Sequence, residues 1–353
     1  MILRNVETLG RPGLRDLVIP GGNSTIDLQP ALAFPGLINS HDHLEFNCYQ
    51  QLGSGHYRDY VEWGNAIHRG SAKEISQVEA VPRALRIRAG ILKNLICGVT
   101  AVAHHGTDAQ CGSSSIHVIG GTRSIHSPRL GKLSAMLIPA GGAVVAHVGE
   151  GIGKEAEREI DRFLRWNLWR KRLVGVHGIA MRPDQARRFT AVVWCPVSNE
   201  FLFGATAPIA RLKDKTVILF GTDSTLTAPW NIWDHVRRAR ALGMLTDEEL
   251  IAALTASAER VWNLPERADI VVARKKRDDQ LEAFFAIEPE DILLVSRGGA
   301  VVLMDAALRS HGGVDVKLFP GRVNGVEKCT VEDFSGLAAA LRSQLPSIPI
   351  PFG

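Results

Sequence analysis

Cysteine is scarce in this sequence, and the few cysteines lie far apart. The chain of 353 residues contains five of them, and no two form a Cys-x-x-Cys pair. Disulfide frameworks and zinc fingers both need cysteines at short, repeated spacings. The scattered set therefore argues against both classes and is typical of reduced thiols in a cytoplasmic protein.

Long hydrophobic runs are missing as well. No stretch approaches the roughly 18 consecutive apolar residues of a membrane-spanning helix. The first ten residues, MILRNVETLG, have neither the basic start nor the apolar core of a secretory signal. We therefore expect a cytoplasmic chain with no membrane partner.

A strong charge of one sign is also absent, because the formal net charge is only +4. The densest basic runs are RWNLWRKR at 165–172 and ARKKR at 273–277. Neither has the glycine and aromatic pattern of a nucleic-acid-binding module. We interpret both runs as solvated surface and expect no nucleic-acid partner.

What the sequence does contain is a series of short apolar runs, each closed by a polar group. They alternate with segments of helical periodicity, and parallel strands buried on both faces have this appearance. The pattern predicts an α/β fold of repeated strand-helix units. The runs are LAFPGLINS, GVTAVAHHG, GGAVVAHVGEG, RLVGVHGIA, TAVVWCPVSN and TVILFGTDS.

The two chain ends have a different pattern. Short strand-like pieces broken by glycine and proline occupy residues 1–33 and return at 266–310, so we predict one small β domain built from both segments. Residues 34–265 then form the main domain, and 311–353 form a C-terminal tail with one helix.

Two helices are predicted together with their faces. Over 79–97, apolar and charged residues separate with helical period, the apolar set being Leu85, Leu92 and Leu95 and the charged set Arg86, Arg88 and Lys93. In the tail, Thr330 is placed as the cap of a helix whose apolar face consists of Phe334, Leu337, Leu341 and Leu345.

The polar residues that close the apolar runs carry the functional information. In an α/β barrel the carboxyl ends of the strands meet at one rim, where the chemistry collects. Residues i and i+2 of an extended segment point the same way, so His41 and His43 can reach one ion while Asp42 points away. Imidazole is the commonest ligand of zinc-like metals, and a catalytic site needs about three or four such groups. The strand-closing set is His41, His43, His147, Glu150, His177 and Asp223.

Several of these residues also have a purely structural interpretation. His177 could be a core histidine satisfied by the backbone, and Asp223 could be a turn or cap residue. Glu150 could simply favour a helix N-terminus. It is their joint order along the chain that favours a metal site.

The motifs PGLINSHDHL, HVGE, VHG, CPVSN and GTDS, in this order, resemble the metal-dependent amidohydrolase superfamily, in particular its cytosine deaminase and chlorohydrolase-like branch. The resemblance covers about residues 1–305. It implies a (β/α)8 barrel of the TIM type with a small β domain made from both chain ends.

The resemblance also implies a role for each matching residue. His41, His43, His147 and Asp223 would hold one divalent ion, zinc in the first place and iron as the alternative. Glu150 would shuttle protons, Asp223 would also accept the proton of the reacting water, and His177 would contact that water or the substrate. Family members with two metals bridge them through a modified lysine. The only lysine in the relevant window, Lys132, lies in a segment with helical character, so a single ion is expected.

The chain departs from the family pattern between residues 105 and 147. This interval must hold strands three and four with their connections, yet each crossover alone takes at least about 10 to 12 residues. We therefore expect an abbreviated barrel in this sector, covered by solvent or by a second subunit, which makes a homo-oligomer possible. Arg123 and His126 are weak candidates for substrate contacts there.

Other residues are weaker candidates for contacts with a substrate. His104 and His105 close the second strand and could line a pocket or merely pack. Trp230 and Trp233 could stack on a planar ring, although core packing is preferred. Ser198 and Asn199 in CPVSN are assigned a structural role in ending their strand.

The leading functional hypothesis is hydrolytic deamination of a nitrogen heterocycle, in which activated water attacks an amine-bearing ring carbon and ammonia leaves. A shuttle such as Glu150 favours it, because deamination needs a proton on a ring nitrogen as well as on the leaving group. Opening of a cyclic amide or imidazolone ring is the alternative. A non-catalytic binding protein is the third, and the presence of all four metal ligands argues against it.

Overall fold

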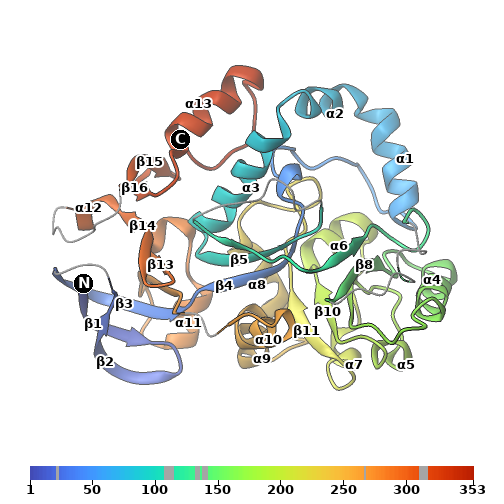
Figure 1. Cartoon of the computed structure of the whole chain (residues 1–353), viewed down its shortest axis with the longest axis horizontal. Helices are drawn as coiled ribbons and strands as arrows, with labels where there is room; N and C mark the ends of the chain where they lie inside the picture. The colour runs from blue at the N-terminus through green and yellow to red at the C-terminus, as the bar shows by residue number, and fades with distance from the viewer. Residues whose placement is uncertain (21–23, 107–114, 132–135, 137–141, 266–267, 310–316) are drawn as a thin grey trace.

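The computed structural model describes residues 1–20, 24–106, 115–131, 136, 142–265, 268–309 and 317–353. Its architecture is mixed α/β, with parallel strands and helices beside one larger mixed sheet (Figure 1). The α/β class predicted from the alternating runs is thereby confirmed. Among the described residues, no helix is both long and apolar enough to cross a membrane.

The parallel strands form two hydrogen-bonded groups, ordered β4-β5-β6 and β11-β10-β9-β8-β7. Most are buried from end to end, which explains their nearly continuous apolar sequences. Their bounds are β4 Leu37–Asp42, β5 Val99–His104, β6 His117–Val118, β7 Arg123–Ile125, β8 Val144–Val148, β9 Leu173–His177, β10 Ala191–Trp194 and β11 Val217–Phe220.

The two groups meet where β4 and β11 end. Asp42 and Asp223 form an isolated parallel bridge, in which the backbone N–H of Asp223 donates to the carbonyl of His41 at 3.0 Å and that of His43 donates to the carbonyl of Asp223 at 3.1 Å. This junction places the His-Asp-His segment directly beside the Gly-Thr-Asp-Ser segment, although they are far apart in sequence.

Helices surround the parallel strands. The longer ones are α1 Tyr60–Gly70, α2 Ala72–Glu79, α3 Arg83–Ile96, α4 Lys154–Arg165, α6 Pro196–Phe203, α8 Ile232–Ala241, α9 Asp247–Leu254 and α10 Ala256–Trp262. Shorter pieces are the 3-10 turns η1 Leu44–Phe46 and η4 Pro289–Asp291 and the helices α5 Pro183–Ala186, α7 Ile209–Leu212, α11 Gln280–Phe285 and α12 Ala306–Arg309.

Helix α3 lies within the predicted 79–97 segment and ends just before Gly98, whose φ of +81° suits a helix terminus. The charged residues of this helix do not all lie on a solvated face, which corrects the simple amphipathic pattern. Arg86 and Lys93 are buried rather than solvated. The reason is that both find polar partners inside: Arg86 donates to the backbone carbonyls of Val81 and Glu45, and Lys93 pairs with Asp42.

Both chain ends build one eight-stranded sheet, ordered β15-β16-β14-β13-β12-β3-β1-β2. The tail therefore supplies two strands that the sequence pattern did not reveal, in addition to the expected helix. Their pairing with β14 favours grouping them with the small β domain. The bounds are β1 Ile2–Thr8, β2 Arg11–Val18, β3 Thr25–Pro35, β12 Ile270–Arg274, β13 Ile292–Arg297, β14 Ala300–Asp305, β15 Phe319–Val323 and β16 Val326–Thr330.

The tail helix, α13 (Phe334–Gln344), begins one turn later than the proposed cap. Thr330 ends β16, and Asp333 caps the helix by accepting a hydrogen bond from the backbone N–H of Gly336 at 2.9 Å. Phe334, Leu337 and Leu341 are buried as predicted, so the helix packs against the protein through the expected face.

Candidate metal centre

Five polar side chains converge at the carboxyl ends of β4, β8, β9 and β11. His41 lies near the end of β4, and His43 lies just after it. His147 is the second-last residue of β8, and His177 is the last residue of β9. Asp223 follows β11. All five are buried. The structure thus brings together residues that span most of the main domain, as the shared rim predicts.

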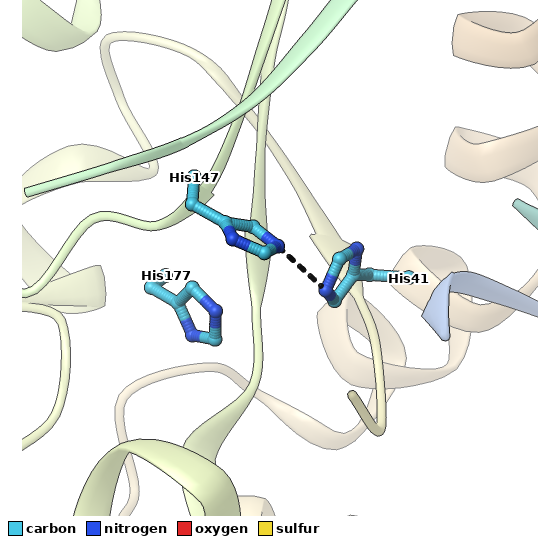
Figure 2. A group of neighbouring side chains, drawn as sticks. All are labelled: His41, His147 and His177. Carbon is cyan, nitrogen blue, oxygen red and sulfur yellow. Dashed lines mark hydrogen bonds between the residues drawn. The ribbon is translucent and has the colours of Figure 1, made fainter. Parts of the chain in front are cut away.

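His41 is at the centre of this group. Its Nε2 lies 3.2 Å from Nε2 of His147 and 3.6 Å from Oδ1 of Asp223, while Nε2 of His43 lies 3.7 Å from the same oxygen. Figure 2 shows the rings of His41, His147 and His177 gathered around one space. The ligand atoms of His41, His43 and Asp223 all lie within 4.8 Å of one another, and so do those of His41, His147 and His177.

The donor set fits a divalent metal of the zinc type. It consists of imidazole nitrogens and one carboxylate oxygen, the atoms that zinc and iron prefer. Nε2 of His177 is buried without a hydrogen-bond partner, and at most one of the facing His41 and His147 nitrogens can carry a proton. A cation between these atoms would satisfy lone pairs that the protein itself leaves unused.

Asp223 is fixed in a geometry that exposes one oxygen to the histidines. Ser198 and Thr227 donate to its Oδ2 at 2.7 and 3.0 Å, which leaves Oδ1 facing His41 and His43. Its φ is +65°, and that of His177 is +70°. Positive φ values cost energy in residues other than glycine, and such strain collects at functional sites.

The surroundings of the site favour the neutral form of His41, His147 and His177. Burial lowers the pKa of His41 to about 4 and holds the pKa values of His147 and His177 below the usual range, and neighbouring imidazoles lower that of His147 further. Burial raises the pKa of Asp223, but its hydrogen bond with His41 and the adjacent imidazoles outweigh this and lower it overall. Neutral imidazoles beside an ionised carboxylate are the protonation states that metal ligands require.

Glu150 has the opposite character. Burial, followed by repulsion from Asp223, raises its pKa well above the usual value. Its two oxygens lie 3.7 Å from Nδ1 of His147 and 3.8 Å from Nε2 of His177. Two buried carboxyl groups with opposite pKa shifts therefore flank the same space, an arrangement typical of an acid and base pair.

Asn199 orients His177 in this arrangement. Its Oδ1 lies 2.8 Å from Nδ1 of His177, so the ring can donate from Nδ1 and keep Nε2 free as an acceptor. Ser198 and Asn199, which the sequence analysis assigned to ending a strand, thus both contact site residues. Their position in the motif CPVSN was the available signal.

A buried polar network supports the junction of β4 and β11. The carboxylate of Asp42 contacts Nζ of Lys93 at 2.9 Å and accepts from the side-chain amides of Asn94 at 2.7 Å and Asn47 at 2.8 Å. Asn47 in turn accepts from Lys93 at 2.9 Å and from the backbone N–H of Thr225 at 3.2 Å. The segments carrying His41, His43 and Asp223 are thereby held to α3. The sequence pattern did not reveal this network, because its members lie on three separate elements.

A cavity of about 380 Å³ opens beside the site. His43, His147, Glu150, His177 and Asp223 line one side of it, and the rest is lined by residues of α1 and α2 and of the segments that follow β4, β7 and β11. Among the weaker sequence candidates, His126 lines this cavity.

The other weak candidates do not line the cavity, although His105 packs against the candidate ligands. His105 stacks on His147 with ring centroids 4.4 Å apart, and His104 lies 3.5 Å from Glu45. Neither these two nor Arg123 and Trp230 line the cavity, and Trp233 packs in the core against Phe34 and Phe284. Lys132 lies outside the described residues.

Neither family models nor curated proteins match this chain. Solved structures do. A mutant of atrazine chlorohydrolase from Arthrobacter aurescens, complexed with zinc and atraton, aligns with a TM-score of 0.64 at 16% identity over 98% of this chain and 100% of that chain. An adenosine deaminase from Xanthomonas campestris with bound zinc aligns with a TM-score of 0.66 at 16% identity, covering 91% and 87%. The Helicobacter pylori aminofutalosine deaminase aligns with a TM-score of 0.57 at 15% identity, covering 79% and 88%.

The chain shares their fold. These neighbours are described as a chlorohydrolase and two deaminases, and the comparison supports the fold that the resemblance drawn from the sequence motifs implies. Identities of 15–16% carry the comparison no further than that.

Proposed function

We propose that this protein is a metal-dependent hydrolase that removes an exocyclic amine from a nitrogen heterocycle and releases it as ammonia. The observation that carries the proposal is the pairing of Glu150 with Asp223. One carboxyl group is held protonated and the other ionised, and both line the same cavity as the candidate ligands His43 and His147 and as His177. The neighbours described as deaminases and hydrolases of heterocycles are consistent with this activity.

His41, His43, His147 and Asp223 would hold the single ion, with zinc preferred and iron as the alternative. When bound, such an ion supplies Lewis acidity, which lowers the pKa of water toward about 7 and makes a nucleophile available at neutral pH. Zinc in two of the solved neighbours supports this choice of metal.

The protein groups would divide the proton transfers between them. Asp223, ionised and fixed through its Oδ2, accepts the proton of the attacking water at Oδ1. Glu150, protonated, delivers its proton to the ring nitrogen next to the attacked carbon. It then takes the proton of the newly formed hydroxyl and passes it to the departing amine, which leaves as ammonia. The proton that Asp223 accepted from the water finally restores Glu150 to its protonated form. His177 accepts or donates a hydrogen bond at that carbon, where charge develops, and such a preorganised contact is worth about 3 kcal/mol.

The test is a screen of the purified, zinc-loaded protein for ammonia release across aminated purines, pyrimidines and triazines, with product masses recorded. We expect ammonia and a product one mass unit heavier, because an amine is replaced by a hydroxyl. A product heavier by one water with all nitrogen retained would instead identify a ring-opening hydrolase. Release from none of these rings, with a full equivalent of zinc bound, would refute the proposal.

For the fold, we propose a barrel-like ring that is abbreviated at its third and fourth positions. Only residues 119–122 connect β6 to β7, whereas a return crossover between parallel strands needs a dozen or more residues. Because β6 pairs with β5 and β7 pairs with β8, the stretch 117–125 would be a single passage of chain that fills both positions.

We also propose a cytoplasmic location. Cys48, Cys97, Cys195 and Cys329 are free and buried, which supports a reducing environment. Residues 1–33, 266–310 and the paired strands of the tail would form the small β domain. Solvent or a second copy of the chain would cover the abbreviated sector of the ring.

A further inference from the structure

The cavity beside the candidate metal centre has two chemically different ends. Polar residues of the site line one end, whereas apolar side chains of α1, α2 and the segments that follow β4 and β11 line much of the rest, together with the exposed polar residues Asn65, His68 and Glu79. These apolar residues are Phe46, Tyr49, Trp63, Ile67, Ile75 and Leu226. From the shape and charge of this lining, we infer that the substrate is an uncharged heterocycle with an apolar substituent. Heterocycles that carry a carboxylate or phosphate substituent are excluded from the cavity. The inference rests on the proposed function of the same site.

The apolar wall is preformed. The ring of Phe46 stacks on that of His43, with centroids 5.2 Å apart and planes 20° from parallel. The indole N–H of Trp63 donates to the backbone carbonyl of Leu52 at 2.9 Å, so the polar atom of this side chain is already used. Ile67 and Ile75 are buried although they line the cavity. An alkyl or aryl group placed here would replace water against these surfaces.

The charge of the lining is one-sided. Among the described residues, the cavity is lined by the ionised carboxylate of Asp223, the carboxyl groups of Glu79 and Glu150, of which Glu150 is held protonated, and by no lysine or arginine. The other titratable groups of the lining are histidines: His43, His68, His126, His147 and His177. Glu79 is exposed, one helical turn beyond Ile75 on α2. An anionic substituent in this space would lose hydration close to the carboxylates of Glu79 and Asp223, and no lysine or arginine of the described lining is there to pair with it, which disfavours binding.

Arg129, which precedes the cavity-lining Leu130, is already engaged. Arg129 lies 2.9 Å from Asp59 and 3.0 Å from Glu159, and its guanidinium carbon lies 4.8 Å from the ring centroid of Tyr60. Of these groups only Tyr60 lines the cavity, so Arg129 forms part of the wall behind it. Releasing Arg129 toward a ligand would leave Glu159 buried and unpaired.

The test uses an aminated ring from which the protein releases ammonia and compares substrates that differ only in one substituent of that ring. The same aminated ring is prepared with an N-propyl, an N-(2-carboxyethyl) and a phosphate-bearing substituent, and kcat/KM is measured for each with the zinc-loaded full chain. We expect the propyl compound to exceed the carboxyethyl compound by about 100-fold, since burying an unpaired charge costs more than losing an apolar contact. Equal or faster turnover of either anionic compound would overturn the inference while leaving the deaminase proposal intact.

A charge reversal at Glu79 tests whether the lining of the cavity sets the preference between neutral and anionic substrates. Glu79→Lys should raise kcat/KM for the carboxyethyl substrate relative to the propyl substrate by about 3- to 10-fold, because it replaces a repulsive charge with an attractive one at a partly solvated position. Glu74→Lys is the matched control, because it reverses a charge on the same helix at a residue that does not line the cavity. An equal change in both variants would mean that overall charge, and not the cavity, sets the preference.

A binding measurement separates this inference from the proposed activity. Calorimetry of the zinc-loaded chain with N-propyl and N-(2-carboxyethyl) derivatives of the deaminated rings needs no turnover. Tighter binding of the propyl derivatives supports the inference even if no ring releases ammonia. Equal or tighter binding of the carboxyethyl derivatives refutes it.

Discussion

Glu150 differs from the other carboxylates of the site in being held protonated by its surroundings. Replacing it by glutamine preserves its size and its place beside His147 and His177 but removes the transferable proton. Because general acid and base assistance contributes about a hundred- to ten-thousandfold, we expect Glu150→Gln to lower kcat by a factor in that range. Zinc content, measured by elemental analysis, should stay at one equivalent, since Glu150 is not among the expected ligands.

The matched control for this variant is Glu155→Gln, on the exposed start of α4, which should keep full activity. If Glu150→Gln retained wild-type kcat, the proton shuttle would have to be another residue, and the division of work between the two carboxyl groups would be wrong.

Lys93 is the residue whose removal should reveal how the ligand segments are held. Its ammonium is the one cation at 2.9 Å from the fully buried Asp42. Lys93→Met would leave this carboxylate buried without a counter-charge, and breaking such a pair typically costs about 3–5 kcal/mol. We expect a loss of this size in the free energy of unfolding, measured by urea denaturation, together with weaker zinc binding.

Lys73→Met, on the exposed face of α2, is the control and should change stability little. The double variant Asp42→Asn with Lys93→Met removes both charges and should recover part of the loss. A double variant no more stable than Lys93→Met alone would contradict the assignment of the cost to the unpaired carboxylate.

At the scale of elements, the approach of α3 to the turn after β4 depends on one glycine. A Cβ atom at Gly90 would lie 2.3 Å from the backbone oxygen of Leu44, which begins the η1 turn directly after His43. Gly90→Ala must therefore push the helix and the ligand segment apart. We expect a destabilisation of about 1–3 kcal/mol, the usual cost of overpacking, and reduced zinc affinity.

Gly70→Ala provides the comparison, because Gly70 ends α1 and has open space where its Cβ would be. That change should be neutral or stabilise the protein by up to about 1 kcal/mol, since alanine favours helix more than glycine does. Similar losses in both variants would mean that helix propensity, and not the contact with Leu44, explains the result.

At the scale of the whole molecule, a bound ion would join segments that the chain keeps far apart. The expected ligands lie at or just beyond the carboxyl ends of β4, β8 and β11, so the metal would act as a cross-link of the native state. A ligand present at a thousand times its dissociation constant stabilises the folded protein by about 4 kcal/mol. We expect chelation to lower the unfolding midpoint by several degrees and added zinc to restore it.

His147→Ala should abolish this zinc-dependent shift, because one of the four expected ligands is lost. His68→Ala, at an exposed histidine on α1, should keep it. A shift that persisted in His147→Ala would place the stabilising zinc at another site.

Part of this molecule could be predicted from local sequence alone. An apolar run ended by a polar residue describes a buried strand, and the rule that parallel strands share one rim then collects His41, His147 and Asp223 without any knowledge of distances. The periodicity of α3 and of the tail helix was likewise visible. Such features are encoded by neighbours in the chain, so they need no tertiary contact to be recognised.

Other features were decided only by tertiary structure. The pairing of Lys93 with Asp42, the hydrogen bonds of Ser198 and Thr227 to Asp223, and the joining of the tail strands to β14 all connect residues on separate elements. Which side chains meet in this way depends on strand register and on the packing of helices, and neither leaves a periodic trace in the sequence. The sequence by itself therefore determined the order and chemistry of the candidate ligands, and the tertiary structure determined their protonation, their supports and the apolar cavity beside them.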